Sequence, residues 1–499
     1  MPTLAIAALS ARALAEAAAR CGHTVLALDL FGDADTRRAA ARWWPVGDAD
    51  QRRIDPARLG AALRQAAARH GAVGWIAGSG FEADLDMLSA GAAVLPLIGN
   101  PAPVWARVQD PAQFFGCLRA HGLPHPAVQR HAPADLAGWL RKDSASSGGS
   151  RVQAAAALSA SGAAGTALPP TALAPSALLP TALPPSALPP TTLPPTACYQ
   201  RVAAGRPVSA TFIGNGSSAV LLGFNQQRVQ ALPGRPYTFA GVVGPVALPA
   251  AAAGVMRRAL AVLVAEFGLR GLGSLDALLD GDQISLLEIN PRPPASLALY
   301  PRCGALGLVD AHWQACVHGI LPALPSAGLA APAAPLSVTP AEPPSASPSM
   351  PSAVSPSASP SMPPTEADAA VAGLATVYAR QAMQIDAAAA ALIAGWPGAH
   401  DLPLPGSRVA AGDPLCSLSA SGADAPAVQA RLDQQTERLL AMLACPPAPA
   451  TTALATNAPA ATAQAATTPA TTPAATAPAT TAPAAPSSTP SLTAETCAR

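Results

Sequence analysis

The stretch GLGSLDALLDGDQISLLEINPRP, residues 271–293, holds two apolar runs around the acidic turn Asp280-Gly281-Asp282. A glycine between two acids, with apolar flanks, is typical of a β-hairpin, because glycine readily adopts the backbone angles of tight turns. Asp276 and Glu288 then come from paired strands and face the same side. Since side chains alternate along a strand, the second strand also presents three polar residues on one face: Glu288, Asn290 and Arg292.

These polar side chains suit a hard divalent cation. Two carboxylates, Asp276 and Glu288, and the amide oxygen of Asn290 form an oxygen set typical of Mg²⁺, which completes its octahedron with phosphates and water. Arg292 could hold a carboxylate or a transferring phosphoryl group through a forked pair of hydrogen bonds. The alternative is a solvent-facing hairpin with alternating polar residues. The apolar flanks argue against it, because burying two acids and an arginine without a ligand or partner is costly.

A second candidate motif is a cation on an expected strand, followed by a small-residue loop, within residues 139–152. Lys142 is the only lysine of the chain, and the other basic residues are arginines, so its presence at one site is informative. The loop Ser146–Gly149 lets backbone N–H groups converge on phosphate oxygens, while the ammonium supplies a compact charge. Taken alone, such a loop beside a lysine is more often a surface connection.

The first hundred residues favour an alternating α/β domain. We expect apolar strands at Leu4–Leu9, Thr24–Leu30, Val73–Ala77 and Val94–Ile98, and a helix at Ala11–Arg20. Loops at strand ends are where such sheets place ligands. Asp29 could suggest a ribose contact, but the first turn lacks the G-x-G-x-x-G of a dinucleotide site, so ending a strand or capping a turn is the favoured role.

Composition limits the partners and the compartment. The formal net charge is +1 at pH 7, which argues against a nucleic-acid partner and against a polybasic membrane patch. Eight cysteines occur without a C-x-x-C pair, which favours a reducing cytoplasm. The apolar N-terminal stretch contains Arg12, Glu16 and Arg20 at helical spacing, so it predicts neither a signal segment nor a membrane span.

Proline divides the chain, which contains 57 of these residues. Residues 168–197 are six tandem pentapeptides, LPPTA, LAPSA, LLPTA, LPPSA, LPPTT and LPPTA. Frequent proline removes backbone donors and fixes φ, so we expect an extended, disordered insertion rather than a helix or a sheet. Two further tracts rich in Pro, Ala, Ser and Thr, Pro322–Glu366 and Pro446–Thr493, predict a linker and a disordered tail.

In this order, the pieces resemble the ATP-grasp superfamily. Asn100–Val128 looks like the helix and turn that lead into its nucleotide-binding part. Lys142 with Ser146–Gly149 looks like the lysine and flexible loop over the phosphates, and Tyr199-Gln200-Arg201-Val202 resembles the hinge that meets adenine. The hairpin residues resemble the superfamily's pattern of metal ligands and a substrate-binding arginine, with the spacing seen in biotin-carboxylase-like members. These residues are Asp276, Glu288, Asn290 and Arg292.

Three further segments resemble a narrower group, the predicted ATP-dependent carboligases related to biotin carboxylase. These are found with tetrahydromethanopterin-linked one-carbon genes in methylotrophic bacteria. Phe31–Arg37 and Gly78–Glu82 look like the N-terminal signatures of that group. The closing block Asp401–Cys416 looks specific to it.

The resemblance implies a fold of class α/β and α+β, with a Rossmann-like pre-ATP-grasp domain before an ATP-grasp fold and with disordered Pro/Ala-rich insertions and tail. The expected parts are the pre-ATP-grasp domain (1–100), the ATP-grasp domain (101–320) with a low-complexity insertion (153–197), a Pro/Ser-rich linker (321–366), a small C-terminal domain (367–447) and a disordered tail (448–499).

The resemblance also implies an ATP- and Mg²⁺-dependent ligase, with Mn²⁺ as the other candidate ion. It would activate a small-molecule carboxylate as an acyl phosphate for attack by an amine or similar nucleophile, in one-carbon cofactor biosynthesis of the tetrahydromethanopterin or methanofuran type. Many relatives are dimers, so a homodimer is also implied. The implied residues are Lys142, Ser147, Gly148, Gly149 and Gln200 for ATP, Asp276, Glu288 and Asn290 for the metal, and Lys142 and Arg292 for catalysis.

Two departures from the superfamily keep alternatives open. Gln109-Asp110-Pro111 stands where many members carry an earlier phosphate-binding lysine, and Gln200 stands where glutamate is common. The first departure favours a nucleotide-binding regulatory protein without turnover, whereas the complete acidic pair argues against it. A third hypothesis, a scaffold that recruits partners through its proline tracts, lacks an evident arginine-flanked P-x-x-P ligand.

Overall fold

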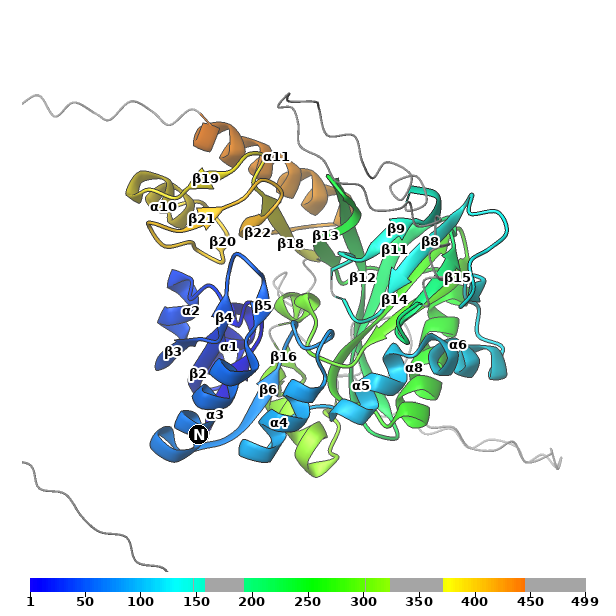
Figure 1. The fold of residues 1–499 in the computed structure, drawn as a ribbon, viewed down its shortest axis with the longest axis horizontal. Helices are drawn as coiled ribbons and strands as arrows, with labels where there is room; N and C mark the ends of the chain where they lie inside the picture. The colour runs from blue at the N-terminus through cyan, green and yellow to red at the C-terminus, as the bar shows by residue number, and fades with distance from the viewer. Residues whose placement is uncertain (147, 158–192, 301, 324–370, 445–499) are drawn as a thin grey trace, which may run out of the picture. The chain divides into compact units, whose positions relative to one another are not determined.

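The computed structural model describes residues 1–146, 148–157, 193–300, 302–323 and 371–444 (Figure 1). Ser147 and most of the three proline-rich tracts that the sequence predicts to be disordered lie outside these ranges. Within the described ranges, no helix combines the length and the apolar character that a membrane crossing needs.

A four-stranded sheet organises the N-terminal part, with the order β3-β2-β1-β6 and parallel pairing throughout. Residues of β1 and β2 are buried almost throughout, because helices cover parallel sheets on both faces and their strands become continuous apolar runs. The predicted strand-helix-strand beginning is confirmed. The elements are β1 (Thr3–Ala7), α1 (Arg12–Arg20), β2 (Thr24–Asp29), β3 (Arg42–Pro45) and β6 (Ala72–Ala77).

Three helices and a short hairpin complete this part. Helix α3 begins at Pro56, directly after Asp55, whose carboxylate accepts the Arg58 backbone N–H. It ends at His70 and is followed by Gly71, with φ of 62°. This is the usual pairing of an acidic N-cap with a left-handed glycine at the other end. The elements are α2 (Ala34–Ala39), β4 (Gly47–Asp48), β5 (Arg53–Ile54), α3 (Pro56–His70) and α4 (Asp86–Val94).

The predicted strand Val94–Ile98 is wrong. Val94 is the last residue of α4, and the chain after it forms an isolated parallel bridge between Leu97 and Trp75. Pro96 lacks the N–H that a ladder needs, although its carbonyl accepts the Trp75 N–H at 2.9 Å. The apolar character of this segment therefore reflects burial beside β6 rather than a strand.

Two short helices lead to a small antiparallel sheet with the order β7-β10-β8-β9. Asp110 caps the second helix by accepting the Ala112 N–H at 2.8 Å, with Pro111 at the first helical position. The elements are α5 (Ala102–Gln109), α6 (Pro111–Ala120), β7 (Val128–Gln129), β8 (Trp139–Asp143), β9 (Val152–Ala154) and β10 (Ala197–Arg201).

An eight-stranded antiparallel sheet, in the order β15-β14-β11-β12-β13-β18-β22-β20, forms the centre of the described chain. Helix α8 (Ala250–Phe267) packs its buried residues against β12, β14 and β15 (Figure 1). The strands are β11 (Arg206–Asn215), β12 (Ala219–Leu232), β13 (Arg235–Gly244), β14 (Arg270–Asp280), β15 (Gln283–Asn290), β18 (Val371–Tyr378), β20 (Ala399–His400) and β22 (Pro414–Gly422).

The chain up to and including the closing block continues the same sheet, because β18 pairs with β13 across Gly241–Gly244 and β22, which begins within the closing block, pairs with β18. Helix α11 covers β18 and β22 with Val428, Leu432 and Leu439, all fully buried. The remaining elements are η1 (Ala295–Leu299), β16 (Arg302–Cys303), β17 (Leu306–Gly307), α9 (Leu308–Trp313), η2 (Gln314–His318), β19 (Met383–Gln384), α10 (Ala387–Ala394), β21 (Arg408–Val409) and α11 (Ala425–Ala444).

Candidate functional site

The hairpin β14–β15 places Asp276 directly opposite Glu288. Gly281 forms the turn with φ of 55°, a backbone angle that glycine adopts without strain. Residues that face each other across antiparallel strands project from the same face of the sheet, so the two carboxylates lie together. The hairpin and the pairing predicted from the sequence are confirmed.

Lys142 approaches this pair from the smaller sheet, where it lies on β8 opposite Cys198. Its Nζ atom is 2.5 Å from Glu288 Oε2, and the residue is only 8% exposed. Burial alone would lower the pKa of Lys142, but the charge and hydrogen bond of Glu288 outweigh burial and raise that pKa. Lys142 is therefore a fixed ammonium at the centre of the site.

The two carboxylates titrate differently. Burial raises the pKa of Asp276 to about 7, and the neighbouring charge of Glu288 adds to the effect. Burial acts in the same direction on Glu288, but the ammonium of Lys142 outweighs it, and the pKa of Glu288 falls below its ordinary value. Lys142, with a smaller contribution from Arg292, thus does not fully compensate the two buried acids, and additional positive charge would stabilise the ionised pair.

Three oxygen-bearing side chains fit a divalent cation. Asp276 Oδ1 is buried and makes no hydrogen bond among the described residues, although the Gln227 side chain favours the ionised form of Asp276. An unpartnered buried carboxylate oxygen is costly. Asn290 Nδ2 donates to Asp276 Oδ2 at 3.2 Å and to Ser274 Oγ at 3.3 Å, so the amide oxygen of Asn290 is available to a ligand. With Glu288, these groups form the hard-oxygen set that Mg²⁺ prefers.

Arg292 follows β15 and is held by an acid from the N-terminal part. Its Nε donates to Glu82 Oε1 at 2.6 Å, while Glu82 Oε2 accepts the Gly80 N–H at 2.7 Å. The Arg292 and Glu82 side chains are 11% and 8% exposed. Because Glu82 engages Nε, the outer nitrogens of the guanidinium remain for a planar anion such as a carboxylate.

The glycine loop lies against β13. The carbonyl of Gly148 accepts the Phe239 N–H at 3.0 Å, and Ser146 Oγ donates to the Asp143 carbonyl at 2.8 Å. Gly149 has φ of 73°, and a Cβ atom there would lie 1.9 Å from the Tyr237 carbonyl oxygen. Only glycine fits at that position, which explains why the sequence needs it there.

Gln200 on β10 is 5% exposed, and its Oε1 atom is buried without a hydrogen-bond partner among the described residues. An amide oxygen accepts hydrogen bonds, so a ligand with an exocyclic amino group, such as adenine, would satisfy it. Gln200 thus fits the position that the resemblance assigns to it.

One cavity of about 950 Å³ joins these groups. This volume is at the upper end of the range for small-molecule sites, with space for more than one ligand. The predicted site residues that line the cavity are Lys142, Gly148, Gly149, Gln200, Asp276, Glu288, Asn290 and Arg292. Ser147, the remaining predicted residue, lies outside the described residues.

Several residues have structural roles instead. Asp29 is the last residue of β2 and accepts the N–H groups of Ala11 and Gly32 and the Trp43 indole N–H, which agrees with the predicted role of ending a strand and capping a turn. His312 is 1% exposed; its Nδ1 accepts the Leu272 N–H, and its Nε2 lies 2.9 Å from the Ile98 carbonyl. The six described cysteines are free thiols.

Glu82 and Asp33 are buried acids near the cavity. Both lie in the segments that resemble N-terminal signatures, but neither had a predicted role of its own. Glu82 follows the Gly78-Ser79-Gly80 loop at the end of β6, and Asp33 follows the end of β2. The signal was present, because carboxyl ends of parallel strands carry ligand-binding loops. No sequence signal indicated the contact between Glu82 and Arg292, because the two residues lie far apart in the chain.

Residues 189–296 match the sequence profile of the ATP-grasp domain. No curated protein resembles the chain closely enough in sequence to match it. Solved structures resemble its fold. A biotin carboxylase domain of a single-chain bacterial carboxylase is 17% identical with a TM-score of 0.55, covering 89% of this chain and 94% of its own.

Two further structures show the same likeness. Biotin carboxylase of Campylobacter jejuni, in its complex with β-γ-ATP, has a TM-score of 0.56 at 13% identity, over 89% of this chain and 95% of that one. The L-amino acid ligase of Bacillus licheniformis has a TM-score of 0.54 at 12% identity, over 88% and 97%. These values show a shared fold: a parallel-sheet N-terminal part followed by an antiparallel ATP-grasp sheet.

Proposed function

We propose that this protein is an ATP- and Mg²⁺-dependent ligase that activates a carboxylate as an acyl phosphate for attack by an amine or similar nucleophile. The observation that carries the proposal is the unpartnered Asp276 Oδ1 beside the Lys142–Glu288 ion pair. A further cation would compensate this excess of negative charge. The two acids line the same cavity as the glycine loop. The ATP-grasp match and the solved structures of similar fold support it.

The nucleotide would lie between the two sheets. Gln200 accepts a hydrogen bond from the adenine amino group, and the backbone around Gly148 and Gly149 covers the phosphates. Lys142 neutralises phosphate charge from its buried position. The small size of the loop residues matters, since a side chain at Gly149 would collide with β13.

Arg292 orients the acceptor carboxylate, and Glu82 fixes the guanidinium. An oxygen of that carboxylate attacks the γ-phosphorus, the bond to the β–γ bridging oxygen breaks, and ADP leaves. The amine nitrogen then attacks the acyl carbon, the bond to phosphate breaks, and the nitrogen loses a proton. Mg²⁺ held by Asp276, Glu288 and Asn290, or Mn²⁺ in its place, would screen the phosphate charges during transfer.

Phosphate release tests this proposal. The wild type should release phosphate from ATP when one carboxylate and one amine of a panel are supplied together. Arg292→Lys should raise the KM for the carboxylate more than the KM for ATP, because a lysine cannot form the forked contact. A matched control is Arg258→Lys, whose guanidinium contacts the Gly122 carbonyl on the surface. Equal losses in both variants would contradict the assigned role of Arg292.

A nucleotide-binding regulatory protein without turnover is the second candidate. Its supporting observation is Gln109, which occupies the region of the missing earlier lysine and donates to the Glu82 carbonyl at 3.1 Å. Because Lys142 is the only lysine of the chain, no second lysine can reach the phosphates. Tight ATP binding without phosphate release for any substrate pair would favour this candidate.

The proposal extends to the pathway, the location and the oligomeric state of the protein. The resemblance of Phe31–Arg37, Gly78–Glu82 and Asp401–Cys416 to one-carbon-linked carboligases supports a role in tetrahydromethanopterin- or methanofuran-type cofactor biosynthesis. A cytoplasmic location, a homodimer and the five-part division of the chain at residues 100, 320, 366 and 447 belong to the same proposal.

A further inference from the structure

The cavity has a second end, which the nucleotide chemistry does not use. Loops that follow three parallel strands line it: Ser10 after β1, Phe31 and Asp33 after β2, and Ser79 after β6. The closing block faces them with Asp401 and neighbouring residues. Ligands of open α/β sheets bind at the carboxyl ends of the strands, so this end is a natural place for a second substrate.

Acidic side chains are concentrated at this end, but three of them have fixed partners. Asp29 accepts from Ala11 N, Gly32 N and Trp43 Nε1. Asp35 accepts the N–H groups of Asp401 and Leu402, at 2.8 and 3.0 Å. Asp401 accepts from Ser10 Oγ and from two nitrogens of Arg12. Asp35 and Asp401 therefore join the N-terminal part to the closing block, whereas Asp29 joins loops within the N-terminal part.

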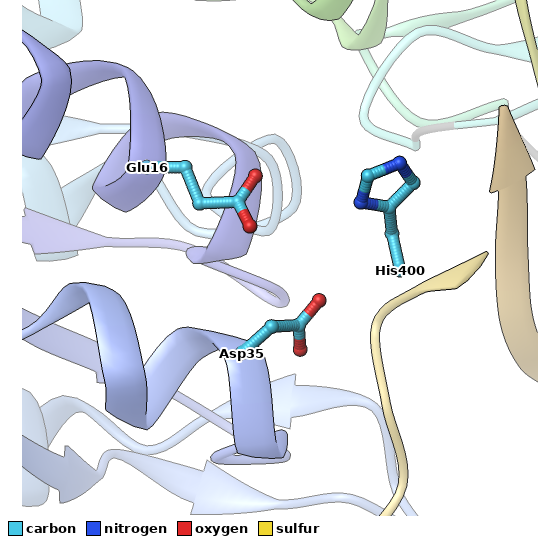
Figure 2. Close-up of side chains that lie close together, drawn as sticks. All are labelled: Glu16, Asp35 and His400. Carbon is cyan, nitrogen blue, oxygen red and sulfur yellow. The ribbon is translucent and has the colours of Figure 1, made fainter. Parts of the chain in front are cut away.

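Figure 2 shows three nearby side chains, Glu16, Asp35 and His400, which converge from α1, α2 and β20. One ligand atom from each lies within 4.8 Å of the others, a spacing that a metal could bridge. Arg12 already pairs with Glu16 at 3.1 Å and lies 3.9 Å from Asp35. A guanidinium in this place supplies the positive charge, so we assign no metal to the trio.

Asp33 differs from its neighbours. It is 8% exposed and lines the cavity, and its side chain makes no hydrogen bond to the helix that it precedes and no ion pair among the described residues, although its backbone carbonyl accepts the Arg37 N–H. Arg12, the cation that acts on the pKa of Asp33, is already engaged by Glu16 and Asp401. Burial, followed by the charges of Asp401, Asp29 and Asp35, raises the pKa of Asp33 to about 8, against a smaller opposite effect of Arg12. A buried carboxylate without a partner is costly unless a ligand completes it.

We infer that the second substrate carries a protonated amino group, and that the carboxylate of Asp33 binds this group at the carboxyl end of the parallel sheet. An ammonium would supply both the charge and the donors that this acidic end lacks. A neutral group could donate a hydrogen bond but would leave the negative charge of Asp33 uncompensated, and an anionic group would add repulsion to that of Asp29, Asp35 and Asp401. The inference rests on the proposed function only in calling the bound amine a substrate.

The experiment measures amine binding without nucleotide, by saturation-transfer NMR. The probes are n-butylamine, benzylamine and glycinamide, each compared with the neutral analogue in which a hydroxyl replaces the amino group. We expect the wild type to bind at least one amine more tightly than its analogue. Asp33→Asn should weaken that binding by about tenfold or more, as expected for losing a charged hydrogen bond.

Asp50→Asn is the matched control, because Asp50 lines the same cavity but is exposed to solvent. This variant should keep nearly all of the amine affinity, since exposed charges interact weakly. Equal losses in the two variants would show general electrostatic attraction and overturn the inference. So would a wild type that prefers no amine, or an Asp33→Asn protein that binds amines unchanged.

A parallel titration with ATP and Mg²⁺ separates this inference from the proposed function. Amine binding with no ATP binding would leave the assignment of Asp33 intact and reject the ligase. ATP binding with no amine preference would do the reverse. Melting curves of both variants confirm that they are folded, and Asp33→Asn should melt no lower than the wild type near neutral pH because it removes an uncompensated buried acid.

Discussion

The substitution Asp33→Asn should change stability in a way that depends on pH. The folded protein raises the pKa of this carboxyl from 3.8 to about 8, through burial and the charges of Asp401, Asp29 and Asp35. At about 1.4 kcal/mol for each pKa unit, ionising Asp33 costs about 6 kcal/mol more in the folded chain than in the unfolded chain. Because the folded-state pKa lies above the unfolded value, this contribution to the free energy of unfolding is fully present below pH 3.8 and is lost as pH rises through about 8.

Asparagine has nearly the same shape and cannot ionise. The variant and the wild type should therefore have similar melting temperatures near pH 4, and the variant should gain steadily until the difference levels off above about pH 8. Melting temperatures by calorimetry across this range, with Asp50→Asn as the exposed control, check the prediction. A difference that does not change with pH would refute the account of Asp33 as a buried, unpartnered acid.

Three further predictions test other contacts. Gly149→Ala should weaken ATP binding in calorimetry by more than tenfold, because its Cβ would meet the Tyr237 carbonyl, whereas Gly234→Ala, with φ of 70° and no atom within 4 Å, should bind ATP normally. Burial lowers the pKa of His312 to about 4, so the stability of wild type over His312→Asn should shrink by about 3 kcal/mol as pH falls from 6.5 to 4; a constant difference in urea melts would contradict this. Glu82→Gln should raise the KM for the carboxylate while leaving ATP affinity nearly unchanged, and an equal loss of both would argue against its hold on Arg292.

The central hairpin could be predicted because its information is local. The turn at Gly281 and the alternation of side chains fix which residues pair, and so they brought Asp276 and Glu288 together. The first strand, helix and strand were equally readable from apolar runs. Val94–Ile98 failed on the same criterion, because apolar composition reports burial, and Pro96 prevents a regular ladder there.

Contacts between distant segments could not be predicted from local pattern. Lys142 reaches Glu288 only because β8 of the small sheet faces the hairpin, and Glu82 reaches Arg292 from the end of β6. The pairing of β18 with β13, across the proline-rich segment, likewise has no local signal. The environment of Asp33 depends on Asp401 from the closing block, so its significance appears only in the folded chain.

The most direct test of the central claim is the binding of ATP, with and without Mg²⁺, measured by calorimetry on the full chain. Wild type should bind ATP tightly only when Mg²⁺ is present. Glu288→Gln and Lys142→Met should each weaken binding by tenfold or more, whereas two controls, Glu266→Gln on the surface and Arg141→Met on the opposite face of β8, should not. Binding that ignores Mg²⁺ and all four substitutions, or no binding at all, would contradict the account.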